Sequence, residues 1–426
     1  MPTGPESTPD KNFLNRQAVA WALYDWGNSA FALSVLAVLF PVFLGSYWSM
    51  GDPGPAVTSR LTWATAVGSV IVSLMAPVLG AIADSGGYRK RFLLVLTLLG
   101  AISTAALSLV GVGGWLWALA LFVMASIGYY SAAVFYDSLI VDVSHPRHYS
   151  LVSSLGLSLG YFGGAFLLTL HVWMINSPDT FGFADGTDVV KFAFVSVGVW
   201  WVIFLLPIML IVRESKRVVA TGSDTIRAAY RSLRETFTKI RAYRNVFMFL
   251  VAYWFYIGGL FTVIIMAVNF GQRLGFSDPD LVMALMITNY VGFPATLLYG
   301  VLAQRFGTKR SIYFGVCVYI AVVCWAAFLN DVRQFYAMSI IIGMVQGGVQ
   351  GISRALYAAL IPPDQSGEFF GFYNMVTKFA HILGPVLIGI VAYVSDEPKY
   401  ILVAVLPMFV LGALLLGRVK PTEEPA

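Results

Sequence analysis

Four charged side chains lie within long apolar runs of the sequence, where a charge is costly unless it is paired or faces water. They are Asp25, Asp137, Arg354 and Lys378. The acids come from the first half of the chain and the bases from the second, so acid–base contacts between the two halves are expected. Such contacts either exchange as the molecule changes conformation or neutralise the charges permanently, and the sequence leaves both interpretations open.

A polar stripe surrounds one of these charges. Gln346 and Gln350 precede Arg354 at steps of four residues, so the three side chains share one face of a helix. A guanidinium group matches a carboxylate with two parallel hydrogen bonds, so the stripe could bind an acidic group of a ligand. Alternatively, it is a polar seam that joins helices. Asp25 and Asn28, three residues apart, could hold an ammonium group or a proton.

Other residues in the apolar runs carry weaker signals. His381 follows Lys378 by three residues and either relays a proton or acts as a hydrogen-bonded spacer. Cys317, Cys324 and four scattered histidines form no metal-ligand pattern, so no metal or other cofactor is expected. Aromatic side chains could line a cavity, although packing and interfacial anchoring are their common uses in membranes. The aromatic residues concerned are Tyr24, Trp26, Tyr129, Tyr130, Tyr253, Trp254 and Tyr256.

The elements that position these residues are membrane-spanning helices. Hydrophobic residues make up 58% and charged residues 12% of the 426-residue chain, against about 25% charged residues in soluble domains. A bilayer core of ~30 Å needs ~20 apolar residues per helix. Twelve runs meet this need, at residues 17–48, 58–83, 92–112, 115–140, 150–175, 190–212, 244–271, 279–303, 311–330, 334–361, 370–394 and 399–418. The sequence therefore predicts an all-α integral membrane protein.

Basic residues are distributed unevenly between the two sides of this arrangement. With the N-terminus inside, 20 of the 27 Lys and Arg residues fall in cytoplasmic segments, 5 fall outside and 2 lie within helices. This positive-inside bias predicts that both termini are cytoplasmic. In the long segment between the sixth and seventh helices, apolar residues recur from Ile226 to Ile240 and predict an amphipathic helix at the membrane surface. Topology accounts for the basic residues, so no nucleic-acid partner is expected.

One loop pattern occurs twice. The loop at residues 80–91 and the loop at residues 300–310 are related by a shift of 220 residues, which superposes two glycines and two basic residues. Twofold repetition of a membrane bundle is typical of secondary transporters. The expected organisation is a cytoplasmic tail at 1–16, a six-helix bundle at 17–212, a cytoplasmic linker at 213–243, a second six-helix bundle at 244–418 and a tail at 419–426.

The first of these loops resembles motif A of the major facilitator superfamily. Its motif residues are Gly80, Asp84, Gly87, Arg89 and Lys90. Glycines permit a tight turn and a close helix approach, and an acid is favoured at the N-terminus of a neighbouring helix. The resemblance implies a conformational latch on the cytoplasmic side, and we expect Asp84 to contact the start of helix eleven, near residues 369–371. Gln304 replaces the acid in the second copy, so the latch is expected on one side only.

A narrower resemblance extends over nearly the whole chain. It is carried by residues 21–29, 135–138, 153–156, 160–164, 346–354, 361–363, 368–373, 378 and 384–385. These segments resemble the family of autophagy-related vacuolar amino-acid effluxers and their bacterial relatives. The resemblance implies a major facilitator fold of two six-helix bundles and amino-acid export. Two positions depart from the family pattern, because Gly258 stands where an acid is frequent and Asp137 where an asparagine is common.

Taken together, these features favour a secondary active transporter that moves a small polar or zwitterionic, amino-acid-like solute by alternating access, with proton-coupled efflux as one form. The alternative is a flippase for a lipid or a lipid-linked solute on the same fold. The sequence contains no HExxH motif and no P-loop, and neither an enzyme nor an ATP-driven pump is expected. We expect a monomer in a bacterial-type inner membrane, with a small-molecule substrate, the lipid bilayer and a proton or ion gradient as partners.

Overall fold

The computed structural model describes residues 13–214, 243–394 and 402–420. The helices, in chain order, are α1 (Arg16–Ala30), η1 (Phe31–Leu39), α2 (Phe40–Phe43), η2 (Leu44–Trp48), α3 (Gly54–Gly86), α4 (Arg89–Ala106), η3 (Leu107–Leu109), α5 (Trp115–Ser138), α6 (Ile140–Val143), η4 (Pro146–His148), α7 (Tyr149–Asn176), η5 (Pro178–Phe181), α8 (Gly186–Ile211), α10 (Arg244–Arg273), α11 (Asp278–Phe306), α12 (Thr308–Ala326), α13 (Val332–Leu360), η6 (Pro363–Gln365), α14 (Ser366–Val394) and α16 (Leu406–Gly417).

The described helices agree with the expected twelve apolar runs. Ten of the described helical runs are long and apolar enough to cross a membrane. The long helix α14 and the shorter apolar helix α16 correspond to the eleventh and twelfth predicted runs. The first run is continuous from Arg16 to Trp48, but its helix widens to the π form in η1 and η2.

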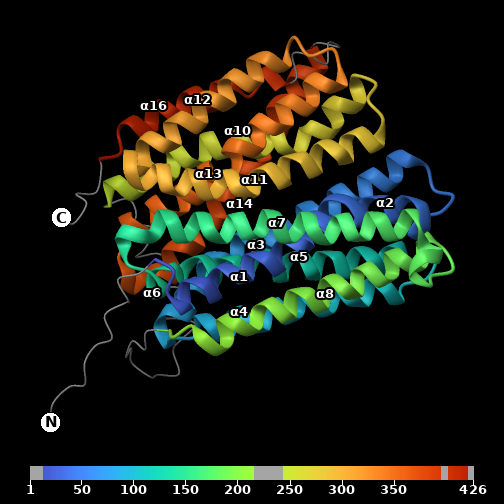
Figure 1. Cartoon of the computed structure of the whole chain (residues 1–426), viewed down its shortest axis with the longest axis horizontal. Helices are drawn as coiled ribbons and strands as arrows, with labels where there is room; N and C mark the ends of the chain where they lie inside the picture. The colour runs from blue at the N-terminus through green and yellow to red at the C-terminus, as the bar shows by residue number, and fades with distance from the viewer. Residues whose placement is uncertain (1–12, 215–242, 395–401, 421–426) are drawn as a thin grey trace.

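The helices form two bundles that pack side by side (Figure 1). In the first, α1 packs against α7 and α8, and α4 packs against α5 and α8. In the second, α10 packs against α14 and α16, and α13 packs against α11 and α12. Two sets of contacts join the bundles, namely α7 with α11 and α13, and α14 with α3 and α5. The candidate site residues therefore come from helices that meet at this junction.

Local sequence signals explain where several helices begin and end. The side chains of Asn15 and Asp185 accept hydrogen bonds from the backbone of the first turns of α1 and α8, which satisfies otherwise unpaired N–H groups. Ser277 and Asp280 form a capping box at the start of α11. Gly87 ends α3 with φ of 63°, a left-handed conformation that glycine adopts without strain.

Most of the predicted linker lies outside the described residues. The proposed amphipathic helix between Ile226 and Ile240 belongs to that part, as do most of the tails at 1–16 and 419–426. We call the end of the bundles that carries Arg89, Lys90, Lys309 and Arg310 the basic end. The α3–α4 and α11–α12 connections lie there, on the left of Figure 1.

Candidate functional site

Arg354 joins the two bundles through their charged residues. Its Nη1 lies 3.0 Å from Asp137 Oδ1, and its Nη2 lies 3.6 Å from Asp25 Oδ2. Nε also donates to Ser153 Oγ at 2.8 Å, and Nη2 donates to the Ser153 carbonyl at 2.9 Å. Arg354 belongs to α13 of the second bundle, whereas these partners belong to α1, α5 and α7 of the first. The expected acid–base contact between the halves is therefore present.

Both acids are held by further hydrogen bonds. Tyr136 Oη donates to Asp25 Oδ2 at 2.7 Å, and Asn374 Nδ2 donates to Asp137 Oδ2 at 3.2 Å. Asp25 and Asp137 are both buried, so these bonds replace water that the carboxylates would otherwise bind. Asn374 was not among the residues singled out from the sequence. The available signal was its position four residues before Lys378, which places both on one face of α14.

Lys378 differs from Arg354 because it has no acid beside it. The side chain is buried, with 7% of its surface exposed. Within the described part of the chain, no carboxylate oxygen lies within 4 Å of its Nζ. The ammonium group lies over the ring of Tyr130 from α5. One turn further along α14, His381 packs its ring against Phe261 at 4.1 Å between centroids.

The two glutamines of the polar stripe contact a tyrosine from the other bundle. Gln346 Nε2 donates to Tyr161 Oη at 3.0 Å, and Gln350 Nε2 donates to the same oxygen at 3.5 Å. The Tyr161 ring lies close to Gly292 and Gly347, where an added Cβ would crowd it. In this conformation the stripe is a polar seam between bundles, which was one of the two interpretations left open.

Two side-chain amide oxygens near this junction have no hydrogen-bond partner among the described residues. They are Asn28 Oδ1 and Gln346 Oε1. Gln346 also lines a largely apolar cavity between α10, α11 and α13, together with Asn289 and Thr288. A second cavity, in the first bundle, is lined by Tyr130, Ser126 and Thr65 among others. Unpaired polar groups beside cavities are the kind of lining that binds a small polar ligand.

The motif A loop contacts the start of α14. Asp84 Oδ1 accepts from Gly367 N at 3.0 Å, and Oδ2 accepts from Glu368 N at 2.8 Å. The acid thus caps the N-terminus of α14, where the helix dipole favours a negative charge. The predicted contact at residues 369–371 is wrong by about half a turn, because α14 begins at Ser366 and not at residue 370. Gly80 lies so close to the Gly367 carbonyl that a Cβ at Gly80 would overlap it.

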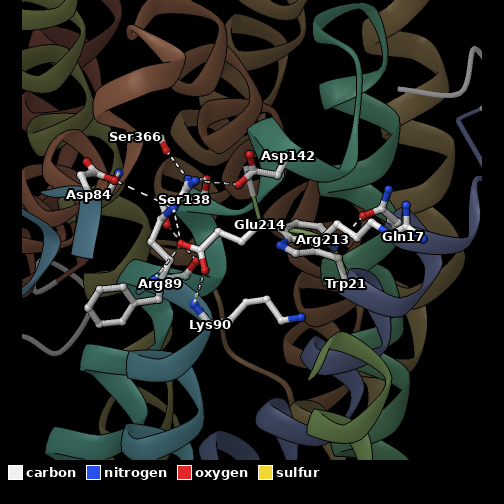
Figure 2. Close-up of polar contacts among 12 residues, drawn as sticks. Gln17, Trp21, Asp84, Arg89, Lys90, Ser138, Asp142, Arg213, Glu214 and Ser366 are labelled. Atoms are coloured by element: carbon white, nitrogen blue, oxygen red, sulfur yellow. Dashed lines mark hydrogen bonds and ion pairs between the residues drawn. The ribbon is translucent and has the colours of Figure 1, made fainter. Parts of the chain in front are cut away.

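Arg89 lies beside three acids, of which one, Asp84, belongs to the same loop. Its Nη2 lies 2.9 Å from Asp142 Oδ2, and its Nε lies 3.3 Å from Glu214 Oε1 and 3.9 Å from Asp84 Oδ1. Nη1 also donates to Ser366 Oγ at 2.6 Å across the bundles. Figure 2 shows Arg89 at the centre of this cluster.

Glu214 is a functional candidate that sequence reasoning missed. Its carboxylate accepts from the backbone N–H of Arg89 at 2.9 Å and of Lys90 at 3.2 Å, so it caps the N-terminus of α4. In return, Lys90 Nζ donates to the carbonyls of Met209 and Val212 at the end of α8. The available signal was a single acid within the basic run 213–217.

The second copy of the loop keeps only part of this arrangement. Lys309 Nζ donates to the carbonyls of Gly417 and Val419 at the end of α16. Lys90 makes the same kind of contact with the end of α8, although the 220-residue shift pairs Lys309 with Arg89. Gln304, which replaces the acid, is exposed. The latch is therefore one-sided in this conformation, as the sequence predicts.

Residues 156–160 read Gly-x-Ser-x-Gly, a hydrolase-like pattern that sequence reasoning missed. The pattern lies inside α7, and Ser158 Oγ donates to the Phe293 carbonyl at 2.5 Å. A nucleophile elbow needs a strand-to-helix turn with an exposed serine, so this serine joins helices instead. In the part of the chain that the structure describes, no group of three His, Cys, Asp or Glu residues could hold a metal ion.

Comparison with known proteins places the chain in a family. The family model described as "Vacuole effluxer Atg22 like" matches residues 47–148 and 141–423. An uncharacterized MFS-type transporter, YxiO of Bacillus subtilis (strain 168), is 33% identical over 409 residues, which cover 95% of both chains. Autophagy-related protein 22 of Eremothecium gossypii is 22% identical over 98% of this chain and 96% of that protein. The match to autophagy-related protein 22-1 of Aspergillus niger, at 23% identity, covers 65% of this chain but only 48% of that protein.

Solved structures show the same fold at low identity. The proton:xylose symporter XylE superposes with a TM-score of 0.74 at 15% identity, over 95% of each chain. The human organic anion transporter MFSD10 gives a TM-score of 0.74 at 15% identity, over 94% of this chain and 99% of that one. These likenesses confirm the predicted major facilitator fold. The ten long apolar helices and the MFS-type relative show that the chain is an integral, multi-pass membrane protein. The chain belongs to the vacuole effluxer Atg22-like family of the major facilitator superfamily.

Proposed function

We propose that this protein is a secondary active transporter that exports a small zwitterionic, amino-acid-like solute by alternating access. The observation that carries the proposal is the contact of Arg354 with Asp25 and Asp137 across the two bundles. A buried ion pair between separate bundles can break when rigid-body rocking admits water to both partners. In this proposal the pair is a gate that closes the basic end, and the segment at 213–243 links two bundles that rock as units.

The charge balance of the junction fits a zwitterion. Asp25, Asp137, Arg354 and Lys378 together carry no net charge when all four are ionised. A solute with one carboxylate and one ammonium group leaves that balance unchanged, whereas a singly charged solute needs a compensating proton or ion. When the gate opens, Asp25 and Asp137 lose their guanidinium partner, and proton uptake by one of them would couple transport to a pH gradient.

The comparisons support this proposal in outline. The word effluxer in the family description supports export, and the proton:xylose symporter offers a precedent for proton coupling on the same fold. The positive-inside rule supports an orientation in which the basic end and both termini lie on the cytoplasmic side of a bacterial-type inner membrane. The transporter acts as a monomer in this proposal.

Uptake into proteoliposomes tests the function. Purified protein is reconstituted, and labelled amino acids are supplied with and without an imposed pH gradient. The expected result is saturable uptake of at least one amino acid that collapses when the gradient is dissipated, and that is lost in Arg354→Gln. Transfer of a fluorescent lipid between leaflets by the same vesicles, without amino-acid uptake, would instead establish the flippase alternative.

A further inference from the structure

The two buried cations of the junction have opposite surroundings. The guanidinium group of Arg354 contacts Asp137, Asp25 and Ser153, and these contacts leave little room for a ligand carboxylate. Lys378 is equally buried, but within the described residues it has no carboxylate within 4 Å and lies against the Tyr130 ring. A ring face compensates only part of what a buried ammonium loses on leaving water.

Lys378 also lies further from the basic end than the gate. Asn374, one turn earlier on α14, contacts Asp137 of the gate. Lys378 is therefore ~6 Å further along the helix axis. On α5, which runs the other way, Tyr130 precedes Asp137 by seven residues, or ~10 Å. A solute that enters from the end opposite the basic end would reach Lys378 before it reached Arg354.

A cavity lies beside Tyr130, the aromatic partner of Lys378, although Lys378 is not among the residues that line it. The ammonium group of Lys378 lies over the ring of Tyr130. Together with Ser126 and Thr65, Tyr130 lines the cavity of the first bundle. In the part of the chain that the structure describes, Ser126 Oγ has no hydrogen-bond partner. Two observations therefore point to a binding site, namely a buried cation with no described acid beside it and a cavity, with an unpaired hydroxyl, next to the ring on which that cation lies.

We propose that Lys378, seated on Tyr130, binds the carboxylate of the transported solute. This assigns to Lys378 the ligand role that the polar stripe suggested for Arg354, and leaves Arg354 as the gate. The inference rests on the proposed function for the solute class, but the site itself requires only a ligand with a carboxylate. An ammonium–carboxylate contact would replace the weaker contact with the ring.

Thermal stability in detergent gives the first test. If Lys378 is an unpaired buried charge in the empty protein, Lys378→Met raises the melting temperature, because a lone buried charge is worse than none. If Lys378 were part of a structural ion pair, the same substitution would lower the melting temperature, and that result would overturn the proposal. Lys191→Met, a partly exposed lysine of α8, is the matched control and is expected to leave the melting temperature unchanged.

Ligand-dependent stabilisation gives the second test. The probes are acetate, the common amino acids and the corresponding amino-acid amides, which lack the carboxylate. Wild-type protein is expected to prefer a carboxylate to its matching amide. Lys378→Met should weaken that binding about 10- to 100-fold, and Lys378→Arg should retain part of it. Tyr130→Phe keeps the ring and should bind normally. The absence of a carboxylate preference in wild type, or its persistence in Lys378→Met, would refute the site.

These binding measurements separate the site from the transport function. Proteoliposomes that move no amino acid, combined with a carboxylate preference that depends on Lys378, would refute the proposed function and support the site. Amino-acid uptake with the same concentration dependence in wild type and Lys378→Met would support the proposed function and refute the site. If the proteoliposomes move no amino acid and the protein shows no carboxylate preference that depends on Lys378, both the proposed function and the site are refuted.

Discussion

The gate formed by Arg354 and Asp137 makes a quantitative prediction about stability. Arg354→Gln leaves Asp25 and Asp137 buried without their cation, which should destabilise the protein by about 3–5 kcal/mol. Asp137→Asn is milder, at about 1–3 kcal/mol, because Arg354 keeps its hydrogen bonds to Ser153 and its contact with Asp25. The double variant should cost less than the sum of the two, with a coupling of about 1–3 kcal/mol.

Reversible unfolding of purified protein in mixed micelles measures this coupling. The matched control is the partly exposed pair of Arg60 and Asp52 at the end opposite the basic end. Its cycle, with Arg60→Gln and Asp52→Asn, should give a coupling below about 1 kcal/mol, because exposed ion pairs contribute little. If the two cycles give equal couplings, or if the Arg354 and Asp137 substitutions are additive, the two groups do not form a buried pair and the gate is wrong.

Three further predictions concern the latch and the topology. Gly80→Ala should open the basic end, because the added Cβ would overlap the Gly367 backbone. The control is Gly68→Ala on the same helix, whose added Cβ would meet only a side-chain atom at 3.9 Å. Maleimide labelling of a cysteine in the gate, applied from the basic side, should rise in Gly80→Ala alone. Glu214→Ala should destabilise the protein by about 1–2 kcal/mol through loss of the α4 cap, and Glu214→Gln should cost less; equal stability of Glu214→Ala and wild type would show that the cap is unimportant. Asp185→Cys should react with an impermeant reagent from outside the cell and Asp364→Cys only from inside, and the opposite pattern would reverse the proposed orientation.

Much of the fold follows from sequence because its signals are local or cumulative. Twelve apolar runs identify the helices by length, and the repeated loop identifies the two halves. The latch was predictable to within about half a turn, since an acid beside glycines at a helix end indicates dipole capping. The error arose because the first turn of α14, Ser366 to Phe369, is too polar at its start to be recognised as part of an apolar run.

The partners of the buried charges were less predictable. Opposite signs in the two halves predicted a contact, but helical periodicity does not say which base meets which acid. Arg354 satisfied both acids because its guanidinium can donate in several directions at once. Lys378 lies a turn beyond Asn374, and an asparagine occupies the position on α14 that reaches Asp137. Such choices depend on the rotation of each helix, which tertiary packing determines.

Helix α14 connects three contacts that sequence treats as separate features. Its first turn binds Asp84 of α3 through Gly367 and Glu368. Further along α14, Asn374 binds Asp137 of α5, and Lys378 lies over the ring of Tyr130, also of α5. All of these partners belong to the first bundle, whereas α14 belongs to the second. Packed helices shift as rigid bodies between discrete arrangements and do not stretch, so a displacement of α14 that changes one contact changes the others. A carboxylate bound at Lys378 would therefore bias the latch and the gate together, which is the coupling that alternating access requires.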